Sequence, residues 1–195
     1  AVPVEVEVEM TGGLFAISIV GLPDVAVRES KERVRAALRA LGLGLKGRVS
    51  VNLAPADVPK EGALLDLPIA LCMMGAAGAL RPPERALYMG ELALDGRLRR
   101  VRGAVPAAFL ARELDLPLYV PRENAGEVAL VRGVRAFCAE TLAELAACLR
   151  GEAEHAHGLD SASAADDVHN ATRLHRRAAH IFCLRLGFHV LCLSD

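Results

Sequence analysis

The chain has 195 residues, enough for one ordinary domain or for one domain with a tail. Hydrophobic residues make up 53% of it and aromatic residues only 4%, so the core must consist of Leu, Val and Ala. The formal net charge of -1 excludes a global electrostatic field that would draw the chain to nucleic acid or a membrane. The five cysteines are widely spaced and no apolar stretch is long enough to span a bilayer, which together predict a cytoplasmic protein with free thiols.

The first half of the chain alternates between strand and helix patterns. Residues 2–10 alternate apolar residues with Glu, which predicts a strand with one wet face, and residues 14–20 return as its hairpin partner. Asp24 is placed to cap a helix over 25–41, whose apolar positions recur at helical spacing. Residues 48–54 alternate again and predict a third strand.

The second half continues this alternation. Asp66 begins an apolar helix that extends to about Gly78, and residues 87–101 predict a hairpin that turns at Asp95-Gly96. The remaining predicted elements are a helix over 104–114, a strand over 117–120, a short helix over 122–130, a strand over 134–138, and a helix over 142–149 capped by Thr141. This order predicts an α/β fold, a sandwich built on a mixed sheet, in residues 1–150.

The composition changes after residue 150. Residues 151–167 have the composition of a linker, which we expect to be poorly ordered, and residues 168–195 form a tail of uncertain character. The tail could be a docking segment, the start of another domain, or a truncated or non-native extension. All six histidines lie beyond residue 150; His155 and His157 could suggest a metal site, but a flexible polar linker explains their spacing better.

Two motifs, one glycine-rich and one basic, resemble nucleotide-binding or phosphate-binding sequences. Residues 42–47, GLGLKG, match the dinucleotide fingerprint, but a helix precedes them and a strand follows, which is the reverse of the required order. The sequence also contains no Walker A motif, so we expect no ATP hydrolysis by that route. The arginines after Asp95-Gly96 form either a phosphate-binding strip or, as is commoner for charge runs, a solvated strand face.

Three segments together resemble one protein family. They are 21-GLPDVAVRESKERVRAAL-38, 53-LAPADVPKEGALLDLPIAL-71 and 90-GELALDGRLRRVRGA-104. In combination they are similar to the N-terminal domain of the Mg-chelatase-like AAA+ ATPases, the competence protein M group. The resemblance covers roughly residues 1–150. It implies a fold of the ribosomal-protein-S5 domain 2-like or Lon-protease-domain-like type.

The resemblance to Lon-type proteases also identifies where a Ser-Lys dyad would lie. The turn Pro59-Lys60-Glu61-Gly62 matches the turn before the nucleophile, whose position falls on Leu64. The lysine position falls on Val105. Neither side chain can act as nucleophile or base, so we expect no catalysis and a structural role for the loop. Lys60 and Asp66 would then pair with each other or cap the helix.

What the resemblance implies is a non-catalytic accessory or assembly domain. In that family a AAA+ module follows, binds ATP and Mg, and forms a ring homo-oligomer; the competence members are implicated in DNA branch migration during natural transformation. For this chain we expect no cofactor and no metal of its own. Two alternatives stay open: a degenerate Lon-like hydrolase, for which Cys72 would be the nearest reactive group, and a protein-interaction module unrelated to DNA.

Two sets of basic residues are candidate contacts to DNA or to a neighbouring subunit. The first set lines one face of the predicted helix over 25–41. The second follows the predicted hairpin turn. The members are Arg28, Lys31, Arg35 and Arg39 in the first set, and Arg97, Arg99, Arg100 and Arg102 in the second.

Overall fold

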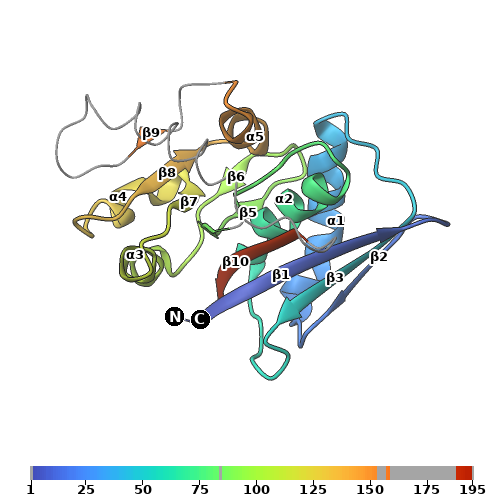
Figure 1. Cartoon of the computed structure of the whole chain (residues 1–195), viewed down its shortest axis with the longest axis horizontal. Helices are drawn as coiled ribbons and strands as arrows, with labels where there is room; N and C mark the ends of the chain where they lie inside the picture. The colour runs from blue at the N-terminus through green and yellow to red at the C-terminus, as the bar shows by residue number, and fades with distance from the viewer. Residues whose placement is uncertain (1, 84, 153–156, 159–187, 195) are drawn as a thin grey trace.

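The computed structural model describes residues 2–83, 85–152, 157–158 and 188–194 (Figure 1). Its strands are β1 (Val2–Thr11), β2 (Ala16–Val20), β3 (Arg48–Ala54), β4 (Leu87–Tyr88), β5 (Glu91–Leu92), β6 (Leu98–Arg99), β7 (Leu118–Pro121), β8 (Ala136–Ala139), β9 (His157–Gly158) and β10 (Phe188–Ser194). Its helices are α1 (Val25–Ala40), α2 (Asp66–Ala76), α3 (Ala104–Glu113), α4 (Ala125–Val128) and α5 (Leu142–Arg150), with short 3-10 turns at Ala63–Leu65 and Arg122–Asn124. Each helix lies within a few residues of its predicted position.

The strands form one mixed eight-stranded sheet in the order β2-β3-β1-β10-β4-β7-β8-β9, and β5 and β6 form a separate hairpin. The predicted pairing of the first two strands is wrong. β3 lies between them, antiparallel to β1 and parallel to β2. The loop between β1 and β2 is longer than the two-residue turns that enforce a hairpin, and α1 carries the chain back so that β3 can insert.

One face of the β1–β3 region packs against helices. Val4, Val6 and Val8 of β1 are buried on this face, whereas the glutamates that alternate with them lie on the opposite, more exposed face. Figure 1 shows α1 and α2 side by side against the sheet. α2 is buried from Asp66 through Gly75, and Asp66 is its only charged residue. The alternation read from residues 2–10 therefore separates the core face from the wet face as predicted.

In the other half of the sheet, β4, β7 and β8 are parallel, and β7 is buried on both faces. β4 pairs with β7, and β7 with β8, all in parallel. Tyr88, Tyr119 and Phe137 occupy matched positions on these three strands, and their rings stack with centroids 4.9 and 5.0 Å apart. All four residues of β7 are buried, as expected for a parallel strand between helical layers. The mixed α/β class predicted from the sequence is confirmed.

The predicted linker and tail fall largely outside the described residues. Of the linker, 153–156 and 159–167 lie outside them, and so do residues 168–187 and 195 of the tail. Within the linker, β9 pairs with β8. Residues 188–194 form β10, which lies between β1 and β4, antiparallel to the former and parallel to the latter.

Gly21 is required where β2 ends. Its φ is 101°, and a Cβ built there would lie 2.0 Å from the carbonyl oxygen of Leu53. Because that oxygen belongs to the backbone of a central strand, it cannot move aside without disturbing the sheet. Gly42, just after α1, has a φ of 76° but no heavy atom within 4 Å of its Cβ position. A substitution at Gly42 therefore tests backbone conformation alone, whereas a substitution at Gly21 adds steric overlap.

We predict that Gly21→Ala is much more destabilising than Gly42→Ala. The Gly42 variant should lose about 1 kcal/mol because only its left-handed conformation is disfavoured. The Gly21 variant should lose about 3 kcal/mol or more because the overlap with Leu53 is added. Urea unfolding followed by circular dichroism measures both free energies. Equal losses would show that the approach to Leu53 is unimportant.

Candidate functional site

The turn that resembles a protease loop is bound to the start of α1. The backbone amide of Lys60 donates to the carbonyl oxygen of Leu22 at 3.1 Å, and the amide of Asp24 donates to the carbonyl oxygen of Lys60 at 3.0 Å. The Asp24 carboxylate accepts from the amide of Val27 at 2.7 Å, which confirms its role as N-cap, and from the amide of Gly62 at 3.1 Å. One carboxylate thus joins the helix end to the turn.

Lys60 is fully buried within this turn. Its ammonium group donates to the carbonyl oxygen of Pro55, and its backbone forms a bridge with Pro23. Pro59 and Glu61 on either side of it are exposed. Gly62 has a φ of 78°, so the turn needs a residue that tolerates the left-handed region. One side of the turn therefore contacts the rest of the chain, and its other side is exposed to solvent.

Asp66 is fully buried and is held by partners from two other elements. Its carboxylate accepts from Arg33 Nε at 2.6 Å, from a second Arg33 nitrogen at 3.1 Å, and from the hydroxyl of Ser30. The backbone amide of Leu92 in β5 donates to it at 3.1 Å. The carboxylate in turn raises the pKa of the Arg33 guanidinium. α1, α2 and β5 meet at this one group.

These contacts correct two expectations about Asp66. The sequence suggested that Asp66 pairs with Lys60 or caps its own helix. The structure instead pairs it with Arg33, and Leu65 occupies the N-cap position of α2 without a side-chain cap. The reason is geometric: the carboxylate points away from its own helix, toward α1 and β5. Asp66 still lies in the first turn of α2, where negative charge is favoured by the helix dipole.

The two dyad positions lack catalytic side chains and lie in packed surroundings. Leu64 is 5% exposed within the 3-10 turn before α2, and Val105 packs against the core from the first turn of α3. Cys72, the nearest reactive group considered, is fully buried in α2. Its thiol lies 3.4 Å from the carbonyl oxygen of Val6, and burial raises its pKa far above the usual range. A thiolate nucleophile is therefore not available there.

Three of the four arginines of the hairpin set are paired with acidic groups. Arg97 binds Asp95 at 2.8 Å and lowers the pKa of that carboxyl, and Arg99 lies 3.5 Å from Glu91. Arg100 donates to Glu127 through its Nε at 2.7 Å. A strand face neutralised in this way is typical of a solvated surface rather than a phosphate-binding strip.

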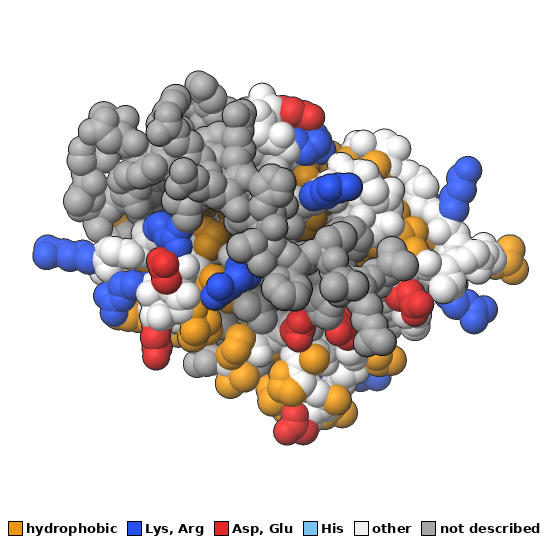
Figure 2. All heavy atoms as spheres, viewed as in Figure 1, with side chains coloured by type: hydrophobic (Ala, Val, Ile, Leu, Met, Phe, Trp, Pro, Cys, Tyr) orange, Lys and Arg blue, Asp and Glu red, His pale blue; other side chains and the backbone are white. Residues whose placement is uncertain are grey.

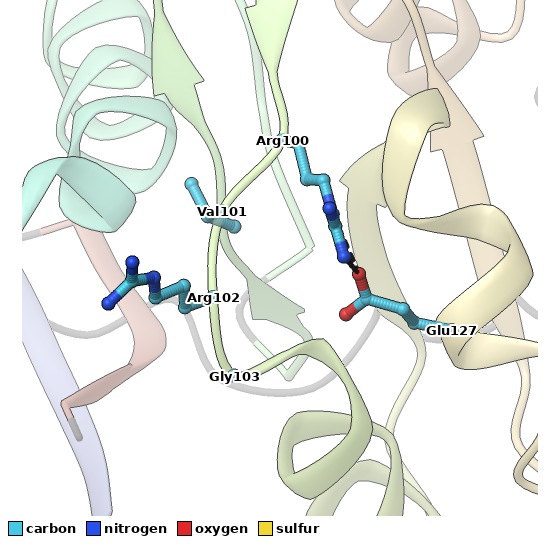
Figure 3. A pocket seen from close by; sticks show the side chains of 5 residues that line it. All are labelled: Arg100, Val101, Arg102, Gly103 and Glu127. Atoms are coloured by element: carbon cyan, nitrogen blue, oxygen red, sulfur yellow. Dashed lines mark hydrogen bonds and ion pairs between the residues drawn. The ribbon is translucent and has the colours of Figure 1, made fainter.

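A shallow pocket of about 390 Å³ lies beside the end of this strand. Arg100, Val101, Arg102, Gly103 and Glu127 line it. Figure 3 shows Arg100 directed toward Glu127 on α4, whereas Arg102 extends to the opposite side of the strand. The two guanidinium groups therefore do not converge on a common point, and the pocket does not form a cradle for a single anion.

The four basic residues of α1 are all exposed and lie along one flank of the helix. Arg35 stacks over the Phe15 ring at 4.9 Å from its centroid and has only a distant acidic neighbour, Glu32 at 3.9 Å. Arg28 donates to the carbonyl oxygen of Asp24 at 3.2 Å. Of the two basic sets, this one keeps more of its charge unopposed. Elsewhere, Figure 2 shows basic, acidic and apolar side chains interspersed on the visible face.

No group of three His, Cys, Asp or Glu side chains in residues 2–83 and 85–152 is arranged to hold a metal ion. None of the described helices combines the length and apolarity needed to cross a bilayer. His155, considered as a ligand from the sequence, lies outside the described residues.

Sequence reasoning missed Ser30 and Arg33, the two partners of Asp66. A signal for Ser30 exists in the sequence. It falls on the apolar stripe of α1 with Val27 and Val34, and a polar residue on a buried stripe needs a hydrogen-bond partner. No local signal distinguishes Arg33 from the other arginines of the helix, because its partner lies 33 residues away.

We predict that Asp66→Asn lowers the free energy of unfolding by about 3 kcal/mol, because it leaves the Arg33 charge uncompensated beside a buried amide. Glu32→Gln removes an exposed carboxylate from α1, next to Arg33 in the sequence, and should cost no more than about 0.5 kcal/mol. Chemical denaturation of both variants provides the comparison. A loss below about 1 kcal/mol for Asp66→Asn would mean that this pair does not hold the elements together.

We also predict slow alkylation of Cys72 and Cys138. Burial raises the pKa of Cys138 from 9.0 to about 11, which lowers its thiolate fraction at pH 8 by roughly 100-fold, and the pKa of Cys72 is raised further. Cys148 is only partly buried and is the internal reference. Iodoacetamide labelling with peptide mapping should modify Cys148 before Cys72 and Cys138, and guanidinium should remove the difference. Equal rates in the native chain would contradict this burial.

Comparison with known proteins agrees with these motifs. Residues 6–124 match the family described as subunit ChlI of Mg-chelatase. An uncharacterized protein, YifB, of Salmonella typhimurium is 38% identical over 169 residues, which is 85% of this chain and 33% of that protein. An uncharacterized protein of Mycobacterium tuberculosis, Rv2897c, is 40% identical over 153 residues, or 76% of this chain and 30% of that protein.

A third relative carries a functional name. Competence protein ComM of Haemophilus influenzae is 38% identical over 152 residues, which is 76% of this chain and 30% of that protein. The chain thus spans about a third of the length of the curated relatives it matches. The family match covers more than half of the chain and includes both the turn at Lys60 and the Asp66 network. This chain belongs to the Mg-chelatase-like family of subunit ChlI and is similar over most of its length to the N-terminal part of the group that includes ComM.

Proposed function

We propose that this chain is a non-catalytic accessory and assembly domain of a Mg-chelatase-like AAA+ ATPase that takes part in DNA processing. The observation that carries this proposal is the turn at 59–62. Its sequence resembles the turn before the nucleophile of Lon-type proteases, yet its hydrogen bonds are made to the start of α1, and the residues at the predicted dyad positions are Leu64 and Val105. A domain of the Lon-like type that has lost its nucleophile can still serve as a rigid assembly unit.

The ATPase activity would belong to a separate AAA+ module. No Walker A motif occurs in these 195 residues, and the relatives are about three times as long as the matched region. We therefore assign ATP and Mg to that module and none to this chain. The cytoplasm is the compartment where such an ATPase and its DNA substrate would meet.

A role in DNA processing is supported by the name of the Haemophilus influenzae relative, a competence protein. By this proposal the parent protein acts in branch migration during natural transformation. The charge distribution limits how this domain could contribute. The hairpin arginines are largely paired with acidic groups, so a direct phosphate contact would have to come from the flank of α1 that carries Arg28 and Arg35. Such a contact would be weak and sensitive to salt.

The alternative of a degenerate hydrolase has little support. It requires a nucleophile near the turn with a base in reach. Leu64 cannot act in this way, Cys72 is buried with a raised pKa, and the Ser30 hydroxyl is buried and engaged by Asp66. The other alternative, a protein-interaction module, is compatible with an assembly role.

We predict that the 195-residue chain does not cleave peptide bonds. Fluorescein-labelled casein and a small fluorogenic peptide should release no more signal than with heat-treated protein, because both dyad positions lack ionisable groups. Adding Leu64→Ala as a control should change nothing, since a leucine cannot take part in the reaction. Cleavage that a serine-directed or cysteine-directed reagent blocks would overturn the non-catalytic assignment.

A further inference from the structure

The edge of the sheet at β2, whose outer side pairs with none of the described strands, combines exposed apolar groups with nearby arginines. We propose that this edge binds an extended, acidic segment of a partner protein, which adds to β2 as a further strand. The inference rests on the proposed assembly role and deepens it by naming the chemistry of the partner. Figure 1 shows β2 at one end of the molecule, away from α3 and α4.

The backbone of β2 offers hydrogen-bond groups on its outer side. Among the described strands β2 is the last on this side of the sheet and pairs only with β3. The amide of Ala16 donates to the carbonyl oxygen of Gly47, which lies on the β3 side, at 3.3 Å. Because the direction of backbone groups alternates along a strand, the amides and carbonyls of Ile17 and Ile19 point outward. An extended segment can bond to these groups while the ladder with β3 stays intact.

The side chains at this edge favour association over solvation. Residues 12–22 contain no charged residue and no proline, although natural sheet edges are usually protected by one or the other. Val20, Leu22 and Val25 are 55%, 55% and 66% exposed. Leu22 also has a φ of 55°, an uncommon conformation for a bulky residue. Here the strained backbone directs a large apolar side chain toward solvent next to the open edge.

The charge beside this edge is mainly positive, although Glu32 lies 3.9 Å from Arg35. Arg33 reaches Asp66 at the start of α2, so its flank of α1 faces α2. Arg28 and Arg35 project from roughly the opposite flank of a helix with 3.6 residues per turn. Arg35 stacks on Phe15, immediately before β2, which places this flank along the β2 edge. A segment added to β2 would therefore lie beside guanidinium groups, which pair best with carboxylates.

This combination favours an acidic peptide over two other occupants. Two copies of this chain joined at β2 would bring their basic α1 flanks toward each other and repel. DNA would meet the arginines, but it would leave the apolar edge of Val20 and Leu22 and the outward amides of Ile17 and Ile19 without complementary groups. Strand addition uses all of these features at once.

The test uses the 195-residue chain and a fluorescent eight-residue peptide that alternates Val with Glu. Two matched peptides act as controls, one with Lys in place of each Glu and one with N-methyl groups on alternate amides. Fluorescence anisotropy should show the acidic peptide binding at least tenfold more tightly than either control, because the Lys peptide meets like charges and the N-methylated peptide cannot complete the ladder.

Protein variants locate the binding site. Arg28→Glu with Arg35→Glu should weaken binding at least tenfold, and Val20→Glu should weaken it through the edge itself. Arg81→Glu with Arg132→Glu makes the same change of charge at exposed positions outside this edge and should leave the Kd within twofold. All these positions are exposed, and circular dichroism checks that each variant is folded.

Three outcomes would overturn the proposal: equal binding of the acidic and N-methylated peptides, an unchanged Kd in the Arg28 and Arg35 variant, or binding of a 20-base-pair duplex in place of the peptide through the same arginines. The last outcome would identify the flank as a DNA contact. Failure here is distinguishable from failure of the proposed function, which depends on the absence of peptide cleavage and is measured separately.

Discussion

A single buried carboxylate determines how the N-terminal half of this molecule is assembled. α2 is enclosed on all sides and carries no charge except Asp66, which has no access to water. Burying an ionised carboxylate is costly unless it is paired and fully hydrogen-bonded. The structure meets this requirement with Arg33 and Ser30 from α1 and with the amide of Leu92 from β5. The relative positions of the three elements follow, since displacing any one of them would leave a buried polar group without a partner.

A second carboxylate, that of Asp24, joins α1 to the turn at Lys60. Asp24 caps α1 and at the same time accepts from the amide of Gly62, so the start of the helix and the Lys60 turn hold each other. The turn then leads within a few residues to Asp66. The loop that resembles a protease turn in sequence is here the connection between the hydrogen bonds of Asp24 and those of Asp66. These contacts hold the loop in its shape with Leu64 at the predicted nucleophile position.

The chemistry that remains lies on the surface and is unevenly distributed. The arginines after Asp95-Gly96 are matched with acidic neighbours, whereas the flank of α1 retains its positive charge beside an uncharged strand edge. Membership of the Mg-chelatase-like family and the length of the relatives are consistent with a domain whose partners are other proteins or other parts of a larger one. Association through a sheet edge, as proposed above, would need no catalytic group.

The sequence by itself determined the features that depend on neighbouring residues. The helix over 25–41, the caps at Asp24 and Thr141 and the turn at Asp95-Gly96 follow from local spacing and backbone chemistry. The structure has all of them at these positions, with α1 ending at Ala40. The motifs also identified the family. These signals are short-ranged, so they can be recognised without knowledge of the rest of the chain.

Only the tertiary structure decided which distant groups meet. β3 lies between β1 and β2, although the sequence pattern suggested a hairpin, because alternation specifies which face of a strand is buried but not which strand is its neighbour. Likewise Asp66 pairs with Arg33 rather than Lys60, since the choice depends on how α1 crosses α2. Which arginines have an acidic partner depends on where the fold places Glu91 and Glu127. Each of these contacts joins residues far apart in the chain, and only the packing of the core sets their distances.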